Sequence, residues 1–133
     1  MTKKLTPLPA IIGDAGQISQ AFVNIIKNAI EAMQEKGGEM TVKTDVGEII
    51  PLDEQGANHS IPAVFVEVTD TGEGIPEQNI KSLFDPFFTT KLTGTGMGLP
   101  ITLRIVEEHK GTIKVRSKKG EGSTFFITFP VPA

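Results

Sequence analysis

Hydrophobic positions early in the chain recur at the spacing of an α-helix. Asp14, followed three residues later by Gln17, fits a capping box, and Gly37-Gly38 is a stop signal. Between them an apolar residue occurs every three or four positions, at Ile18, Ala21, Phe22, Ile25, Ile26, Ala29, Ile30 and Met33. This spacing is typical of a helix with one buried face. The pattern predicts a helix that starts after Asp14 and ends before Gly37.

Other stretches are typical of strands, since apolar and polar residues alternate in several of them and 63–69 is a run rich in β-branched residues. We expect strands over residues 9–12, 39–50, 63–69, 112–117 and 124–129, and further helices over 77–84 and 99–109. The segments between them are rich in proline and glycine and are expected to be loops. The resulting order predicts an α+β fold. It is a two-layer sandwich, in which about three helices cover one face of a mixed sheet of about five strands.

The composition is that of one ordinary globular domain. The 133 residues include no cysteine, which excludes a disulfide scaffold, a cysteine nucleophile and a thiolate metal site. With 13 basic and 16 acidic residues the net charge is −3, so no nucleic-acid partner and no direct membrane contact are expected. No apolar run reaches the roughly 18 residues of a membrane span. We interpret residues 1–9 as a leader and 10–133 as the domain, and expect a cytoplasmic protein.

A glycine-containing segment follows the strand expected over 63–69. Its sequence is Asp70-Thr-Gly72-Glu-Gly74-Ile75. One interpretation is an ordinary turn, in which Asp70 caps a backbone amide. The other is a carboxylate at the mouth of a pocket, where it accepts a hydrogen bond from a ligand amine. The glycines would then let the ligand approach the backbone closely. The segment alone leaves both interpretations open.

Alternating glycines also precede the helix expected over 99–109. This segment is Gly94-Thr95-Gly96-Met97-Gly98-Leu99. Its backbone amides can point inward together, and a helix start adds unpaired N–H groups, so the segment can bind an anion. It is not a Walker loop, because no Gly-Lys-Ser/Thr follows, and a flexible hinge is the alternative. A further Gly-x-Gly at 120–122 is interpreted as a hairpin turn.

Polar residues form a stripe along the first helix. Such a stripe is usually the solvated side of a helix, but Asn24 and Asn28 lie one turn apart. An Asn amide oxygen is a suitable ligand for a hard cation such as Mg²⁺, and Lys27 beside it can neutralise phosphate. Lys91, which follows a phenylalanine-rich loop, is another candidate phosphate contact. His59 and His109 are interpreted as isolated surface residues.

The order of these segments resembles four motifs of one family. The asparagine, first glycine, phenylalanine and second glycine boxes of sensor histidine kinases are similar to Asn24-Ile-Ile-Lys-Asn28-Ala-Ile-Glu, Asp70-x-Gly72-x-Gly74-Ile, Phe84-x-Pro86-Phe87-Phe88 and Gly94-x-Gly96-x-Gly98-Leu. The resemblance covers nearly the whole chain. It implies the catalytic ATP-binding domain of these kinases, in the superfamily of gyrase, heat-shock chaperone, kinase and MutL ATPases. It also implies a Bergerat-type fold with a mobile ATP lid over 85–97.

The resemblance implies a role near the phosphates of ATP for several positions. Asn28 would bind the Mg²⁺ that bridges the triphosphate, with Asn24 and Lys27 close by and Lys91 at the γ-phosphate. Backbone amides around the phosphates would come from Gly94, Thr95, Gly96, Met97, Gly98 and Leu99. ATP and Mg²⁺ are therefore the expected cofactors.

At the adenine end, the resemblance implies that Asp70 accepts the exocyclic amine. Gly72, Gly74 and Ile75 would let the ring lie against the backbone, and Thr124 would lie near it, acting through water. Many relatives cover the adenine with a Tyr from the asparagine-box helix. This chain contains no Tyr, so Ile30, Met33 or a Phe would take that place.

One departure bears on the reaction. The hydrolases of the superfamily carry a Glu one turn before the metal-binding Asn, where it activates water. The matching residue here is Asn24, which cannot act as a base, so the γ-phosphate is expected to pass to another nucleophile. The resemblance implies a histidine on a separate dimerising helical domain, and residues 1–9 would be a remnant of the linker to it. Neither histidine of this chain fits the phosphoacceptor context.

The expected partners are that histidine-bearing domain and, indirectly, the receiver domain of a response regulator. The parent protein can be membrane-anchored, and the isolated domain is expected to be a monomer. Two alternatives stay open. One is a non-catalytic domain that senses ATP or ADP, and the other is a serine kinase of the anti-sigma type.

Overall fold

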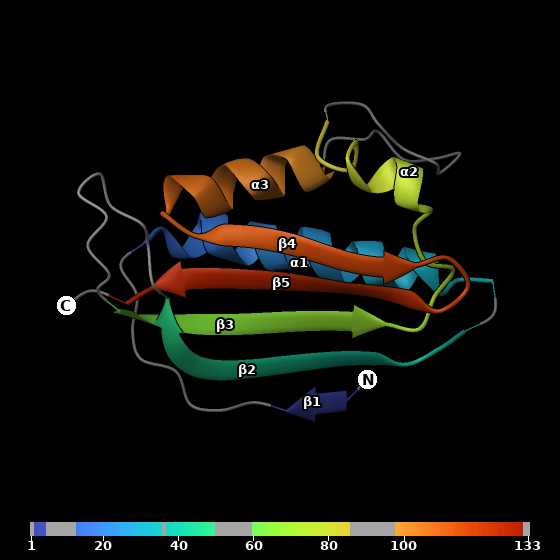
Figure 1. The fold of residues 1–133 in the computed structure, drawn as a ribbon, viewed down its shortest axis with the longest axis horizontal. Helices are drawn as coiled ribbons and strands as arrows, with labels where there is room; N and C mark the ends of the chain where they lie inside the picture. The colour runs from blue at the N-terminus through green and yellow to red at the C-terminus, as the bar shows by residue number, and fades with distance from the viewer. Residues whose placement is uncertain (1, 5–12, 36, 50–59, 86–97, 132–133) are drawn as a thin grey trace.

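The strand β3 (Ile61–Asp70) lies at the centre of a five-stranded sheet. The computed structural model describes residues 2–4, 13–35, 37–49, 60–85 and 98–131. The sheet order is β1-β2-β3-β5-β4, and the other strands are β1 (Thr2–Lys4), β2 (Met40–Ile49), β4 (Thr112–Lys118) and β5 (Gly122–Pro130). β1 pairs with β2 in parallel and every other pair is antiparallel, so the sheet is mixed (Figure 1).

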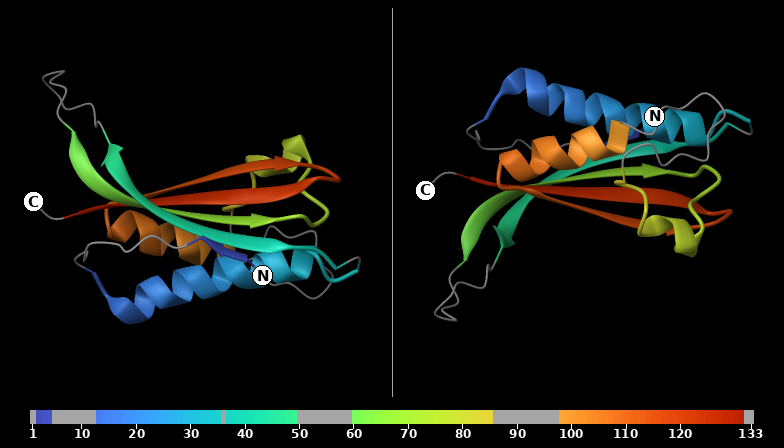
Figure 2. Two further views of the ribbon diagram at one scale, coloured as in Figure 1. Left: turned by 90° about the horizontal axis from the view of Figure 1, so that it is seen from below. Right: turned by 90° about the horizontal axis from the view of Figure 1, so that it is seen from above.

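Two long helices, α1 (Ala15–Ala32) and α3 (Gly98–Glu108), cover one face of this sheet (Figure 2). α1 buries Ala21, Ile25 and Ala29, which are four residues apart and therefore on one side of the helix. Ile25 and Ala29 belong to a core formed with the inward residues of the sheet and with α3. Its members are Ile25, Ala29, Met40, Val64, Val66, Val68, Val106, Phe125, Ile127 and Phe129. The alternation along β3 and β5 sends every second side chain into this core.

These observations confirm the expected α+β two-layer sandwich. The first helix begins after its predicted cap, since the Asp14 carboxylate accepts a hydrogen bond from the Gln17 N–H at 2.9 Å. It ends at Ala32, before the predicted stop, and a turn leads to Gly37. The short helix α2 (Glu77–Ile80) ends four residues early and contacts β4 at the edge of the sheet (Figure 1). The strand expected over 9–12 lies outside the described residues, whereas β1 forms within the expected leader.

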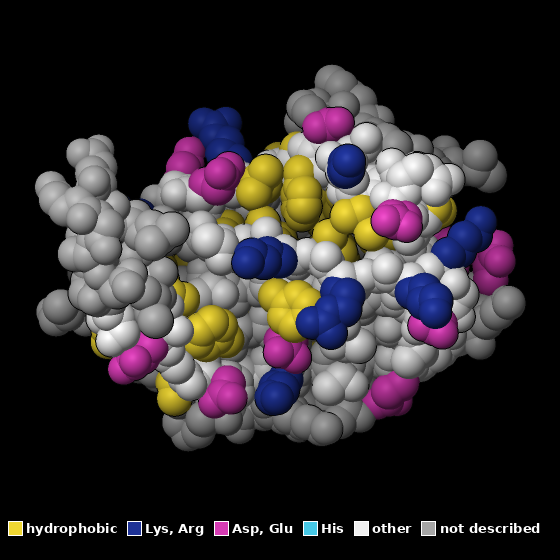
Figure 3. Space-filling view, viewed as in Figure 1, with side chains coloured by type: hydrophobic (Ala, Val, Ile, Leu, Met, Phe, Trp, Pro, Cys, Tyr) yellow, Lys and Arg dark blue, Asp and Glu magenta, His cyan; other side chains and the backbone are white. Residues whose placement is uncertain are grey.

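On the other face of the sheet, the described residues carry charges of both signs (Figure 3). Its outward residues include Lys43, Glu67 and Lys114, which follow the cross-strand register of β2, β3, β5 and β4. The Arg116 guanidinium lies 5.2 Å from the centre of the Phe126 ring, which it shields from water by a cation–π contact. Among the described residues, no helix is long and apolar enough to cross a membrane.

The expectation that His109 is an isolated surface residue is wrong. Its Nε2 accepts a hydrogen bond from the Asp14 N–H at 3.0 Å, and its Nδ1 lies 2.7 Å from the Ile105 carbonyl oxygen. A nitrogen that accepts carries no proton, so the proton is on Nδ1 and is donated to Ile105. The ring also meets Phe129 edge to face, with centroids 6.3 Å apart. His109 therefore joins the end of α3 to the start of α1.

We expect His109→Ala to lower the free energy of unfolding by about 2 kcal/mol, because two hydrogen bonds and one aromatic contact are lost. His109→Phe keeps the ring against Phe129 and should lose only the hydrogen-bond part. Urea denaturation of the three proteins measures both values. A His109→Ala protein as stable as the wild type would show that this contact does not hold the helices together.

Candidate functional site

A buried carboxylate ends the central strand. Asp70 is only 2% exposed, and its Oδ1 accepts a hydrogen bond from the Gly72 N–H at 2.9 Å. Removal from water raises the pKa of Asp70 above its ordinary value, and the nearby Glu73 adds to this. Hydrogen bonds from the backbone N–H groups of Gly72 and Ser123 oppose the rise. A carboxylate is costly to bury, so its position indicates a polar ligand or a structural need.

Glycines let three backbone segments meet around Asp70. A Cβ on Gly72 would lie 2.5 Å from the Ala32 carbonyl oxygen at the end of α1. Gly74 has a φ of +72° and lies against the Lys118 backbone, and Gly122 has a φ of +110° and lies against the Asp70 carbonyl. Any other residue would collide with main-chain atoms at these places. The segment after β3 is therefore in direct backbone contact with both α1 and the β4–β5 hairpin.

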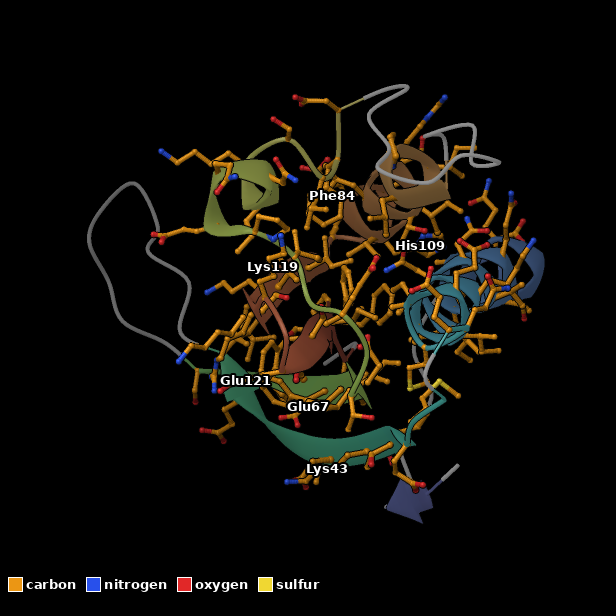
Figure 4. All side chains as sticks on the ribbon, turned by 90° about the vertical axis from the view of Figure 1, so that its right-hand side faces the viewer. Lys43, Glu67, Phe84, His109, Lys119 and Glu121 are labelled. Atoms are coloured by element: carbon orange, nitrogen blue, oxygen red, sulfur yellow. The ribbon has the colours of Figure 1, made fainter. Side chains whose placement is uncertain are left out.

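Hydrogen bonds hold the segment 71–75 from three sides. The Glu73 N–H donates to the Ala32 carbonyl at 3.2 Å, and the Glu73 carbonyl accepts from the Gly120 N–H at 2.7 Å. The Thr71 hydroxyl accepts from the Glu39 N–H at 2.9 Å, just before β2. Figure 4 views this end of the molecule and labels Lys119 and Glu121 on the hairpin. The same view shows Phe84 between α2 and α3, where it packs against the core.

A second set of contacts joins α1 to the start of α3. The Asn24 Nδ2 lies 3.3 Å from both the Gly98 carbonyl oxygen and the Thr102 Oγ1, and the Thr102 hydroxyl donates to the same carbonyl at 2.8 Å. Thr102 is fully buried. Asn28 is half-buried one turn further along α1, and Lys27 is exposed. α1 therefore contacts both the start of α3, through Asn24, and the segment after β3, through the Ala32 carbonyl.

The whole arrangement matches a known family. The model of the histidine kinase-, DNA gyrase B- and HSP90-like ATPases matches residues 13–133. The chain belongs to this ATPase family. Sporulation kinase C of Bacillus subtilis is 43% identical over 121 residues, which are 91% of this chain and 25% of that protein. Sporulation kinase A of the same organism is 45% identical over 120 residues, 90% of this chain and 18% of that protein.

Solved structures show the same likeness at the level of the fold. A mycobacterial sensor histidine kinase, MprB, aligns with a TM-score of 0.76 and 27% identity over 99% of this chain and 82% of that one. The nucleotide-free catalytic domain of the histidine kinase ThkA aligns with a TM-score of 0.73 and 29% identity, over 97% of this chain and 76% of that one. The predicted family and fold class are confirmed. The chain spans a quarter or less of the two sporulation kinases.

Within this ATPase-family domain, the structure brings together Asp70, Gly72, Gly74 and Ile75 at the end of β3. Gly98 and Leu99 open α3, where Leu99 packs against the core. The Asn24 side-chain amide is already engaged in hydrogen bonds to Gly98 and Thr102 of α3. The predicted residues Lys91, Gly94, Thr95, Gly96 and Met97, and the lid expected over 85–97 apart from Asp85, lie outside the described residues.

The structure places Thr124 differently from the expectation. Its Oγ1 lies 3.0 Å from the Oγ1 of Thr69, which it faces across the β3–β5 pair. Neighbouring strand residues point to opposite faces of a sheet, and it is Ser123 that is buried opposite Asp70. Sequence reasoning therefore missed Ser123, and it also missed Ser117, which contacts it. Both serines flank the Gly-x-Gly of the hairpin, and this position is the sequence feature that could have identified them.

The two hairpin glycines should differ sharply in their tolerance of a side chain. Gly122→Ala forces a Cβ into the Asp70 backbone and strains a φ of +110°, so we expect a loss of about 3 kcal/mol or more in the free energy of unfolding. Gly120 has a φ of +88° but nothing within 4 Å, so Gly120→Ala should cost only about 1 kcal/mol. Thermal denaturation compares the pair, and equal losses would contradict the close approach.

The raised pKa of Asp70 predicts a pH dependence of stability. The Asp70 carboxyl group stays protonated to a higher pH in the folded state than in the unfolded state. The contribution of Asp70 to the free energy of unfolding is therefore greatest below the ordinary pKa of about 3.8. It falls as the pH rises towards the folded-state value and is constant above it. Asp70→Asn cannot ionise and should lack this decline. Urea denaturation across acidic pH measures it, and parallel profiles for the two proteins would argue against the raised pKa.

Proposed function

We propose that this chain binds Mg-ATP and donates the γ-phosphate to a histidine on a separate dimerisation domain of a sensor kinase. The observation that carries the proposal is Asp70, a carboxylate buried at the end of the central strand among glycines. A carboxylate there can accept a hydrogen bond from the adenine amine, and the neighbouring glycines let a flat ring approach the backbone. Asp70 is thus the adenine-recognising group of the proposal.

The side chains available for a metal suit Mg²⁺. Among the described residues, no cluster of three or more His, Cys, Asp or Glu side chains could hold a metal ion. A cation at this site would instead take one amide oxygen from Asn28, with phosphate oxygens and water as the other ligands. Mg²⁺ is commonly held in this way, by few protein ligands and by substrate phosphates. When bound, it would neutralise charge on the triphosphate.

Water is a poor nucleophile at this site, which favours transfer over hydrolysis. The Asn24 side chain donates to Gly98 and Thr102, and an amide cannot remove a proton from water. Phosphoryl transfer depends mainly on positioning and charge neutralisation. Lys27 on α1, together with Lys91 and the amides of the 94–99 segment, would supply that charge and those donors. The nucleophile would be an imidazole brought by the partner domain.

The relatives support this role over the two alternatives. Sporulation kinases C and A and the sensor histidine kinase ZraS of Escherichia coli, which is 39% identical, are all named as kinases. They are several times longer than this chain, so a phosphoacceptor domain and a membrane anchor belong to the proposal for the parent protein. The chain itself would work on the cytoplasmic side. A response regulator would then receive the phosphate from the histidine.

Calorimetric titration with ATP and ADP, with and without Mg²⁺, tests nucleotide binding. We expect wild-type binding to be stronger with Mg²⁺, and Asn28→Ala to lose that enhancement, because its amide oxygen is the proposed ligand. Gln34→Ala removes an exposed amide in the turn after α1 and should behave as the wild type. An unchanged magnesium response in Asn28→Ala would count against this role.

Mixing the chain with a histidine-bearing helical dimerisation domain and labelled ATP then tests transfer. An acid-labile, alkali-stable phosphoprotein is the expected product. Binding without transfer would favour the nucleotide-sensing alternative, and an acid-stable phosphoserine would favour the anti-sigma type of kinase.

A further inference from the structure

The Ser117 hydroxyl makes three hydrogen bonds next to the proposed adenine site. Its Oγ accepts from the Ile75 N–H at 2.7 Å, donates to the Gly122 carbonyl at 3.0 Å, and lies 2.8 Å from the Ser123 Oγ. A serine hydroxyl has one proton and two acceptor positions. Because its proton goes to Gly122, the Ser123 hydroxyl must be the donor in the third bond. The three bonds use the one donor and both acceptor positions of the Ser117 hydroxyl, so the donor and the acceptor of each bond are determined.

These bonds link the two ends of the segment 70–75 through the sheet. Ser117 of β4 faces Ser123 of β5, and Ser123 faces Asp70 of β3 in the strand register. The Ser123 N–H donates to the Asp70 carboxylate, and its hydroxyl donates to Ser117. Ser117 in turn receives the Ile75 N–H, at the far end of the segment. The distance between the Asp70 carboxylate and the Ile75 backbone is therefore set by β4 and β5.

We propose that Ser117 is a positioning residue for adenine recognition, which holds the backbone at Gly74 and Ile75 in register with the Asp70 carboxylate. The proposal rests on the proposed function, in which Asp70 accepts the adenine amine. Ser117 does not touch the nucleotide. The adenine ring would meet a hydrogen-bond acceptor, Asp70, at one end and the backbone of Gly74 and Ile75 at the other. Both lie in the segment 70–75, and Ser117 holds the far end of that segment in place.

The conformation of Gly74 explains why this anchor matters. Gly74 has a φ of +72° and lies against the backbone of Lys118, so the segment is pressed onto the hairpin immediately before Ile75. The Ile75 N–H has the Ser117 hydroxyl as its acceptor within the described residues. Replacing the hydroxyl by hydrogen leaves both this N–H and the Ser123 hydroxyl without their acceptor. The segment would then sample positions in which Gly74 and Asp70 no longer fit the same ring.

Ser117→Ala, Ser117→Thr and a control, Thr112→Ala, test the role. Thr112 is exposed at the other end of β4. Binding of ATP and of inosine triphosphate, which has a carbonyl in place of the adenine amine, is measured by calorimetry with Mg²⁺. We expect Ser117→Ala to bind ATP about tenfold more weakly, as for the loss of one hydrogen bond, with inosine triphosphate affected less. Ser117→Thr keeps the hydroxyl and should keep the wild-type preference for ATP over inosine triphosphate, and Thr112→Ala should match the wild type.

Amide hydrogen exchange of the nucleotide-free protein gives an independent measurement. In Ser117→Ala the Ile75 amide should exchange at least tenfold faster, while the Val66 and Phe125 amides in the core strands keep their rates. Faster exchange at all these amides, with an unchanged preference for ATP over inosine triphosphate, would show a structural role only and overturn the proposal.

The two proposals fail in different ways. A wild-type chain that binds no ATP overturns the proposed function and this inference with it. A wild-type chain that prefers ATP, beside a Ser117→Ala variant with the same preference, overturns the role of Ser117 alone.

Discussion

The burial of one carboxylate shapes the end of the domain at which the central strand β3 terminates. Asp70 lies at the end of the central strand, 2% exposed, and an ionised oxygen placed there requires N–H donors in place of water. The donors come from Gly72 in its own loop and from Ser123 in the neighbouring strand. Both can reach it only because glycines allow main-chain segments to approach each other. The path of the loop and the position of the hairpin follow from this requirement.

The two long helices are held to each other by polar contacts at two levels. The start of α1 meets the end of α3 through Asp14 and His109, and the middle of α1 meets the start of α3 through Asn24 and Gly98. The two helices therefore run in opposite directions, and about ten residues of each, roughly 15 Å of helix, separate the two contacts. These contacts fix where α3 begins relative to α1.

Much of the fold could be predicted because its signals are local. The period of the first helix, its cap at Asp14 and the alternation of the strands were sufficient to predict the sandwich, with boundaries within a few residues for most elements. The helix over 77–84 was predicted too long, since only Glu77–Ile80 is helical. β1 was not predicted, because three polar residues carry no alternating pattern and are ordered by pairing with β2.

The site was predicted less completely. Asp70 and the glycines after it could be proposed from the sequence, because a carboxylate and two glycines form a recognisable motif directly behind a hydrophobic strand. Ser117 and Ser123 were not predicted, whereas the family resemblance assigned Thr124 a place near the adenine. Two adjacent hydroxyl residues look alike in a sequence, whereas the register of β3 and β5 decides which of them faces the carboxylate.

The sequence by itself therefore determined the elements, the family and the residues that carry recognisable chemistry, because helical periods, strand alternation and motif spacing act over a few neighbouring positions. The tertiary structure decided what those residues contact. It made His109 a link between two helices and Asn24 an anchor for α3, and it placed a hairpin turn against the segment that follows Asp70. Such contacts join residues that are 42 to 95 positions apart. They depend on strand register and helix packing, which no local pattern of the chain specifies.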